Sequence, residues 1–556
     1  MFGQGCIEGR FAALQIGALR LGATRLPLCP TGPAILYRRA GSPVQFGVAT
    51  RNIVLRGRLG ASPFALNAGR AQMLGQREFA ASGLALRLGQ PDAPVLINAS
   101  TLRGTFEGSG ISGTFAGGDG KVGNVPLTFS DASGKWRFYD SDLTIDAGLT
   151  VADAIAPAKF YPLRSDNMHF TLADGLIRAT GTLKHPASGT RVAEVAVDHR
   201  LSNGVGRALL DVPGIRFGQG LQPEELTRLT EGVIALVTGN FRGQGRIAWA
   251  GRGQVRSTGE FTISDTDLAA RFGPVTGLNT TVRFTDLLGL ETAPGQIATV
   301  KSINPGILVS DGVVRYSLLP GRLVRVERGE WPFMGGRLIL QETILNFNRP
   351  TAKRLTFEVA GLDAKTFVDS LGFKEIGVTG VFDGVLPMIF DDAGGRIVGG
   401  RLDSRPGGGT LSYNGVVNKA NTGMVSRLAF DALRDLRFKS MIIRLDGMLD
   451  GEFATRLTVE GVGLGNTSTQ RFIRSINKIP FKFNVSIKGP FRALIATAKS
   501  VRDPQVLISD ALPRPLKDVP GIVTEVRRIE NQSSQTQTPV DEQVSVGTKP
   551  IPPTPQ

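Results

Sequence analysis

The chain contains few of the side chains that bind metals or act as nucleophiles. Its 556 residues include only three histidines and two cysteines. Metal centres in proteins take three or four ligands, mostly from these residue types and carboxylates. His169, His185 and His199 are widely separated, with no second ligand type at metal-binding spacing. We therefore expect no metal site and no cofactor.

The chain also lacks a long uncharged apolar run. A membrane-spanning helix needs about 20 predominantly apolar residues, and no such run occurs. The N-terminal segment contains Glu8, Arg10 and Arg20, so the apolar part of a signal peptide cannot be drawn there. Two interpretations stay open: the protein is cytoplasmic, or its true start lies upstream of Met1.

The two cysteines, Cys6 and Cys29, bracket a segment that reads as a pair of strands, residues 11–28. If the chain is periplasmic, they can form a disulfide. Two free, buried thiols are the alternative.

Positive charge exceeds negative charge, with 64 lysines and arginines against 48 acidic residues and a net charge of +16. We interpret the excess of positive charge as spread along the body of the chain. A nucleic-acid binder would interleave basic residues with exposed stacking aromatics, but the aromatic residues here are mainly the 30 phenylalanines, which suit dry surfaces. We expect no nucleic-acid partner. The arginine excess reflects either genome composition or contact with lipid phosphates, which arginine binds bidentately.

Period-two alternation of apolar and polar residues is the dominant local pattern, closed every ten to fifteen residues by Gly, Asn or Asp. Residues 481–488, 355–359 and 457–460 each place apolar side chains on one face and polar ones on the other. This pattern is typical of half-buried antiparallel strands. Short helices are expected at 223–237, 362–371, 426–436 and 467–477.

At one strand every fifteen residues or so, the chain would form roughly 33 strands, and such a sheet must curl or split. The predicted fold is mainly β: a long curled antiparallel sheet forming a repeating β-groove with one apolar face, a few short helices and a disordered C-terminal tail. We divide it into an N-terminal groove region, 1–318, a C-terminal groove region, 319–500, and a linker with the tail, 501–556.

Candidate catalytic motifs have simpler explanations. The two GxGxxG matches, 108–113 and 118–123, have strand-like segments on both sides, whereas a dinucleotide site needs a strand before and a helix after. The acidic pairs Asp140 with Asp142 and Asp391 with Asp392 lie in turn-like surroundings and are expected to be solvated. We predict no catalytic residue and no enzymatic activity.

The order of segments in the second half carries a resemblance to a known family. It runs through residues 380–387, 397–402, 406–413, 433–441 and 480–489. This order resembles the C-terminal region of the YdbH family, among the AsmA-like proteins that include TamB and YhdP, most strongly over 319–498.

The resemblance implies a β-groove that carries phospholipid across the periplasm between the inner and outer membranes. It also implies an N-terminal inner-membrane helix and a small outer-membrane lipoprotein as partner at the far end. This chain departs from the family in lacking the anchor helix and much of the N-terminal half. An older family label, dicarboxylate transport, would need a cluster of cations, and none is evident.

From the alternation, we predict the apolar side chains that line the groove: Leu338, Leu340, Leu355, Phe357, Val359, Phe453, Leu457, Val459, Phe481, Phe483, Val485 and Ile487. Two other function classes stay open. One is a secreted or periplasmic structural or binding protein like a β-solenoid, without lipid transfer. The other is an enzyme with a scattered carboxylate site, such as a carbohydrate hydrolase.

Overall fold

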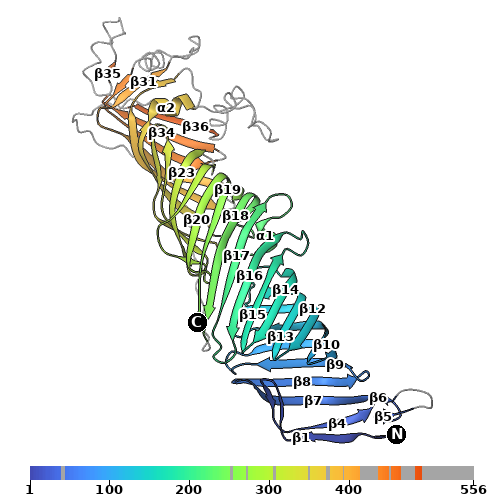
Figure 1. The fold of residues 1–556 in the computed structure, drawn as a ribbon. Helices are drawn as coiled ribbons and strands as arrows, with labels where there is room; N and C mark the ends of the chain where they lie inside the picture. The colour runs from blue at the N-terminus through green and yellow to red at the C-terminus, as the bar shows by residue number, and fades with distance from the viewer. Residues whose placement is uncertain are drawn as a thin grey trace, which may run out of the picture.

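The computed structural model describes residues 1–38, 44–250, 254–270, 273–304, 308–347, 351–370, 376–391, 394–413, 436–449, 452–461, 463–464 and 483–490. Within these ranges the chain forms one antiparallel sheet of 30 strands, a four-stranded sheet, a two-stranded hairpin and two short helices. The large sheet is elongated and twisted, with β1 at one end and β36 near the other (Figure 1). The predicted fold class is confirmed.

The N-terminal strands run from β1 to β17. They are β1 (Ile7–Phe11), β2 (Leu14–Ile16), β3 (Leu19–Leu21), β4 (Thr24–Pro30), β5 (Leu36–Tyr37), β6 (Gln45–Phe46), β7 (Val48–Leu59), β8 (Ser62–Met73), β9 (Glu78–Leu88), β10 (Val95–Glu107), β11 (Gly110–Lys121), β12 (Leu127–Tyr139), β13 (Asp142–Asp153), β14 (Leu163–Ala173), β15 (Leu176–Lys184), β16 (Arg191–Arg200) and β17 (Gly206–Phe217).

The remaining elements begin with α1 (Pro223–Leu226). They continue with β18 (Ile234–Trp249), β19 (Val255–Ala270), β20 (Gly273–Asp286), β21 (Glu291–Thr292), β22 (Gln296–Ile303), β23 (Val309–Leu319), β24 (Leu323–Phe333), β25 (Gly336–Leu340), β26 (Thr343–Asn346), β27 (Lys353–Asp363), α2 (Ala364–Ser370), β28 (Ile376–Val378), β29 (Val381–Asp391), β30 (Gly394–Ser404), β31 (Gly409–Tyr413), β32 (Leu436–Phe438), β33 (Ser440–Met448), β34 (Glu452–Glu460), β35 (Gly463–Leu464) and β36 (Phe483–Pro490).

From β7 to β20 each strand pairs antiparallel with the next, as a continuous meander. The sheet continues through β22, β23, β24, β25, β27, β29, β30, β33, β34 and β36. The division predicted after residue 318 falls at the end of β23, and β23 pairs directly with β24. The division therefore stays a prediction.

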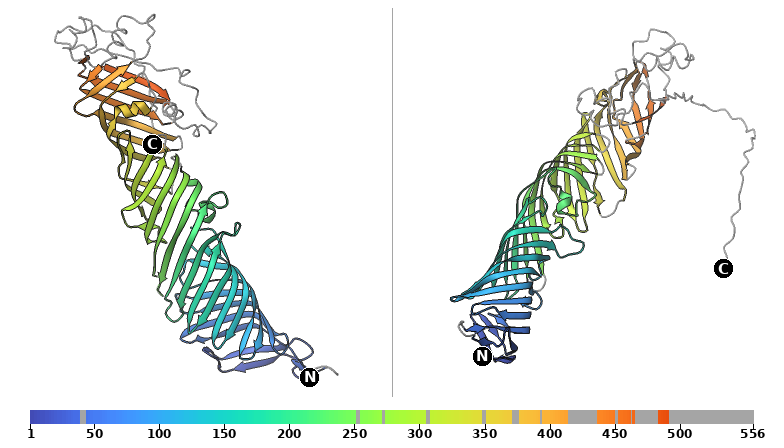
Figure 2. Two further views of the ribbon diagram at one scale, coloured as in Figure 1. Left: turned by 45° about the horizontal axis from the view of Figure 1, so that its top comes forward. Right: turned by 90° about the vertical axis from the view of Figure 1, so that its right-hand side faces the viewer.

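Irregular residues inside the long strands account for the curvature of the sheet. Gly117, Asp131 and Asp265 have positive φ values of 63°, 53° and 46°. Each lies where the pairing register shifts, in β11, β12 and β19. Such bulges bend a strand and increase its twist. The sheet is therefore strongly curved along its length rather than flat (Figure 2).

The predicted helices are shorter than expected or absent where the structure describes them. The helix predicted at 223–237 is wrong beyond Leu226, because the Thr227 hydroxyl bonds back to the Lys159 carbonyl and β18 begins at Ile234. In 362–371 only α2 is helical; Asp363 ends β27 and its carboxylate accepts the Thr366 amide at 2.7 Å.

The predicted helix at 467–477 lies outside the described residues, as does 426–436 except for Leu436, which begins β32. The predicted disordered tail also lies outside them.

At the N-terminal end, Cys6 and Cys29 are joined by a disulfide with an S–S distance of 2.05 Å. The bond links the residue before β1 to β4, and β4 pairs with both β1 and β7. It therefore ties the first strand to the large sheet. Disulfides of this kind form in oxidising compartments.

Candidate functional site

One face of the large sheet is apolar across successive strands. Residues directly opposite each other on antiparallel strands lie on the same face, so the register can be followed across the sheet. One such row crosses eight strands and contains no polar side chain: Leu55, Leu66, Leu86, Ile97, Gly120, Phe129, Val151 and Leu163. We call this side of the sheet the inner face.

Two further rows extend the inner face toward the C-terminal end. The first is Phe138, Leu143, Leu172, Ile177, His199, Gly206, Trp249 and Val255. The second is Trp331, Leu338, Val359, Gly384, Leu402, Ile443, Leu457 and Val485. His199 is the single polar member of the three rows.

Glycines on the inner face make room for aromatic rings on neighbouring strands. A Cβ at Gly104 would lie 2.4 Å from the Phe79 ring, and one at Gly206 would lie 2.4 Å from the Trp249 ring. The high glycine content therefore has a structural role inside strands as well as in turns. Alternating pairs such as Gly243 and Gly245 were the sequence signal for it.

Seven of the predicted lining residues have described side chains, and their register places them on the inner face, where other side chains of the protein pack against them. Leu338, Leu340, Phe357, Val359 and Val459 are buried in a single cluster, and Leu355 and Leu457 pack against it. Phe453, Phe483, Val485 and Ile487 lie on β34 and β36, where Val485 pairs with Leu457 in register. Phe481 lies outside the described residues.

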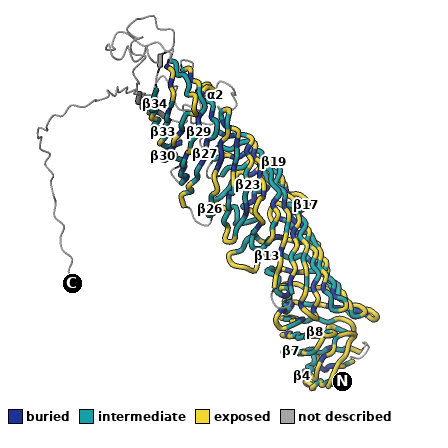
Figure 3. The backbone as a smooth tube through the Cα atoms, turned by 90° about the vertical axis from the view of Figure 1, so that its left-hand side faces the viewer, coloured by how far each residue is buried: buried dark blue, intermediate teal, exposed yellow. Residues whose placement is uncertain are grey.

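Protein side chains cover the inner face around this cluster. They come from α2, with Phe367 and Val368, and from the small sheet formed by β28, β31, β32 and β35, with Leu436 and Phe438. In β7 to β13, by contrast, inner-face residues such as Leu66, Ile97 and Phe129 are half-buried. Exposed positions are most frequent near β4, β7 and β8 (Figure 3). The less covered part of the inner face is therefore N-terminal to the residues predicted from the sequence.

The two long edges of the sheet touch at loops far apart in sequence. The Gln90 side chain after β9 donates to the Ser202 carbonyl before β17 at 2.8 Å. Lys159, after β13, donates to the carbonyl of Leu288, after β20. Arg322, between β23 and β24, donates to the Leu229 carbonyl at 3.1 Å.

Because successive strands run in opposite directions, successive loops alternate between the two edges of the sheet. The two loops of each contact therefore lie on opposite edges. A buried cluster joins Leu88 and Val95 from one edge to Leu172 and Leu201 from the other. We call this line of contacts the seam. The sequence predicts a curled sheet that forms a groove, and in the structure the two edges of that sheet come together at these loops.

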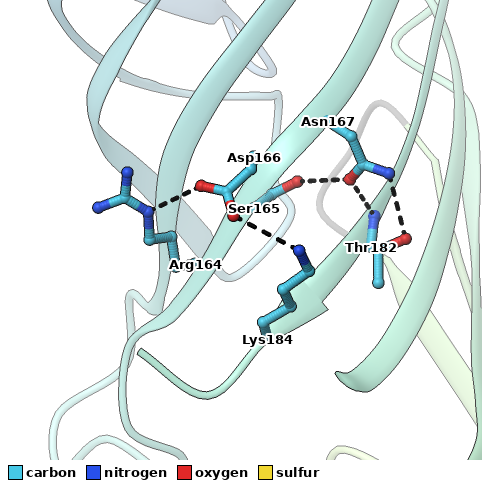
Figure 4. Close-up of polar contacts among 6 residues, drawn as sticks. All are labelled: Arg164, Ser165, Asp166, Asn167, Thr182 and Lys184. Carbon is cyan, nitrogen blue, oxygen red and sulfur yellow. Dashed lines mark hydrogen bonds and ion pairs between the residues drawn. The ribbon is translucent and has the colours of Figure 1, made fainter. Parts of the chain in front are cut away.

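The opposite, outer face carries polar and charged side chains. Arg164 and Lys184 are opposed in register on β14 and β15, and Asp166 accepts from both, at 2.9 Å and 3.5 Å (Figure 4). The hydrogen bond from Arg164 lowers the pKa of the Asp166 carboxyl. Next to this group, Asn167 bonds to Thr182 across the same strands. This face is suited to water.

The histidines lie in three separate environments. His169 contacts Asp146 at 2.7 Å on the outer face, and His185 bonds to Ser188 in a turn. His199 is 1% exposed, and Trp249 donates its indole N–H to His199 Nδ1 at 3.1 Å. Burial lowers the pKa of His199, which favours the neutral ring. Among the described residues, no three His, Cys, Asp or Glu side chains gather as metal ligands.

The two GxGxxG motifs and the described residues of the acidic pairs lie in strands and in the turns between them. Gly108 is in the turn between β10 and β11 with φ 61°, and the chain continues into strands after both motifs. Asp140 lies in the turn between β12 and β13, and Asp391 pairs with Arg396 at 2.7 Å. Asp392 lies outside the described residues.

Comparisons with known proteins give a family assignment. No curated protein and no solved structure matches the chain. In the described part of the structure, no helix combines the length and apolar character needed to cross a bilayer. A family model, described as YdbH-like, intermembrane phospholipid transport protein YdbH, matches residues 7–512. Since this match spans most of the chain, the protein belongs to the YdbH-like family of lipid transport proteins.

Proposed function

We propose that this protein acts as a bridge along which phospholipids cross the periplasm between the inner and outer membranes. The observation that carries the proposal is the inner face, whose three rows cross β7 to β19 and β24 to β36 with a single polar side chain, His199. The disulfide between Cys6 and Cys29 supports an oxidising compartment such as the periplasm. A small outer-membrane lipoprotein at the C-terminal end is part of the same proposal.

The energetic argument concerns the acyl chains. Moving a phospholipid through water exposes roughly 30 methylenes at about 0.8 kcal/mol each, on the order of 20 kcal/mol in total. A continuous apolar face removes most of that cost because the chains never lose apolar contact. The half-buried residues of β7 to β13 are where we expect acyl chains to lie. No bond is made or broken, so the function requires no catalytic residue.

A charge on the inner face tests the proposal. Phe129→Asp places a carboxylate within the apolar row of β12, whereas Thr128→Asp places one on the exposed outer side of the same strand. We expect Phe129→Asp to lower the phospholipid that co-purifies with the protein at least tenfold, as burying an unpaired charge beside acyl chains is costly. The measurement is mass spectrometry of extracted lipid.

Thr128→Asp is the matched control and should retain wild-type lipid. Circular dichroism establishes that both variants keep their β-structure. If the folded Phe129→Asp protein carries as much lipid as the control, the groove function is contradicted and a structural or binding role is favoured.

A further inference from the structure

The seam joins loops that lie at a regular offset along the sheet. The loop after β9 meets the loop after β16 through Gln90 and Ser202. The loop after β13 meets the loop after β20 through Lys159 and Leu288. In both contacts seven strands separate the two loops. Because the offset is the same, the seam follows from the winding of the whole sheet, and it closes over the inner face of the strands between.

Apolar side chains from both edges lie beneath the polar contacts of the seam. Phe160 and Leu226, from loops on one edge, pack against the same buried cluster as Leu287 from the other edge. Leu287 reaches over the inner face, because a Cβ at Gly245 of β18 would lie 2.7 Å from its Cδ2 atom. Side chains of the protein therefore cover the inner face of β18, which acyl chains would otherwise contact.

The contacts across the seam are weaker than the pairing between strands. Neighbouring strands such as β16 and β17 are joined by continuous pairing in register. Each described polar contact of the seam is instead one side chain bonded to one carbonyl. A single hydrogen bond contributes little net stability, since water replaces the partner when the bond breaks. The edges can therefore separate at the seam while the strands stay paired.

The charged headgroup of a phospholipid decides where the lipid can lie. Burying a charged group without a partner costs far more than breaking a few hydrogen bonds to water-accessible loops. Two donors of the seam are cations, Lys159 and Arg322, and each donates to a backbone carbonyl. A phosphate oxygen is a stronger acceptor for such a donor than a carbonyl is. The headgroup is therefore more stable between the two edges than on the apolar inner face.

We propose that the seam is a lateral gate that opens to admit a phospholipid. The acyl chains then lie on the inner face, and the headgroup stays between the separated edges, in water. Lys159 and Arg322 exchange the carbonyls of Leu288 and Leu229 for the headgroup phosphate. The proposal rests on the transport function and adds how a phospholipid reaches a part of the inner face that the protein itself covers. Entry only through the ends of the rolled sheet is the alternative.

A cross-link across the seam tests the proposal on the full chain. Gln90→Cys and Ser202→Cys are joined by a thiol-reactive reagent with a short spacer, or by one with a long flexible spacer that lets the edges separate. Cys6 and Cys29 are bonded to each other and do not react. The purified protein is mixed with vesicles that contain phosphatidylethanolamine labelled on an acyl chain. Lipid adducts are measured at a photoreactive residue in place of Ile247, on the covered inner face of β18.

Two references separate a closed gate from a general loss of lipid binding. Leu66 on β8, a half-buried inner-face residue before the first seam contact, is the second photoreactive position. Asn98→Cys with Asp119→Cys is the control pair for cross-linking. The two native side chains bond at 2.8 Å on the paired strands β10 and β11, which stay together when the seam opens.

We expect the short cross-link to lower phospholipid adducts at position 247 at least about tenfold, because the headgroup would have to be buried. Adducts at position 66 should persist, and neither the long spacer nor the control cross-link should change either position. Equal adducts at position 247 with the short and the long spacer, or equal loss at both positions, would overturn the gate. If the protein without a cross-link gives no adducts at either position, the transport function itself is contradicted, and the gate with it.

Discussion

At the scale of single residues, inner-face glycines determine where large aromatic rings can lie. Gly312 on β23 is an example, because a Cβ there would lie 2.0 Å from Trp331 Nε1. Trp331 is 4% exposed and belongs to the largest buried cluster. The composition reveals the excess of glycine, but only the register reveals which ring needs the space.

Gly312→Ala should therefore destabilise the protein. The added methyl group forces the Trp331 ring or its strand to shift, at a cost of about 1–3 kcal/mol in the free energy of unfolding. Gly220→Ala, where no atom lies within 4 Å of the new Cβ, is the control. Urea unfolding measures both, and equal stability of the two variants would contradict the packing argument.

His199 gives a residue-scale dependence on pH. Burial lowers its pKa below the ordinary value of 6.5, so the unfolded state binds the proton more tightly than the folded state. The stability that this neutral ring contributes is complete above about pH 6.5 and is lost as pH falls toward the folded pKa, by at most about 1.4 kcal/mol per pH unit.

Between pH 7.5 and 5, His199→Gln should lose less stability than the wild type, as measured by denaturant unfolding at each pH. Carboxyls whose pKa is lowered, such as Asp166 and Asp383, lose their contribution only below this range. Parallel pH profiles for the two proteins would show that His199 is not the titrating group.

At the scale of elements, alternation predicts the strands well and the connections poorly. Leu355, Phe357 and Val359 were assigned to one face from spacing alone, and all three belong to or pack against the same cluster. The helix predicted at 223–237 fails beyond Leu226 because its last residues, from Ile234 to Val237, begin β18. The seam depends on twist accumulated over many strands, which no local pattern encodes.

The seam predicts which distant loops can be cross-linked. Cysteines at Gln90 and Ser202, where the side chain and carbonyl are 2.8 Å apart, should react with one short bifunctional reagent. Cysteines at Gln90 and Ser188 should not, since Ser188 lies on the same edge six strands away, about 29 Å at 4.8 Å per strand. Mass spectrometry identifies the cross-linked pairs. A cross-link between positions 90 and 188 without one between 90 and 202 would contradict the contact between the two edges at the seam.

At the scale of the whole molecule, the inner face is mainly apolar from strand to strand, with polar exceptions such as His199 and Thr280. Its coverage changes along the length: side chains of α2 and the small sheet pack on it near β27 to β33, while residues of β7 to β13 are half-buried. The sequence indicated the alternating faces and the family, but it pointed to the C-terminal residues because their alternation is the most regular. How much of the inner face is covered depends on segments that fold back onto it. The alternation within strands does not predict those contacts.

The most direct test of the central claim is site-specific photo-cross-linking along the inner face in cells. A photoreactive residue is placed at Leu66, Phe129, Ile247 or Val314, and at the outer-face neighbours Asn67, Thr128, Ala248 and Arg315 as controls. The account predicts phospholipid adducts at all four inner positions and few or none at the outer ones. Adducts confined to one stretch of the inner face, or equally frequent on both faces, would contradict a continuous path for lipid.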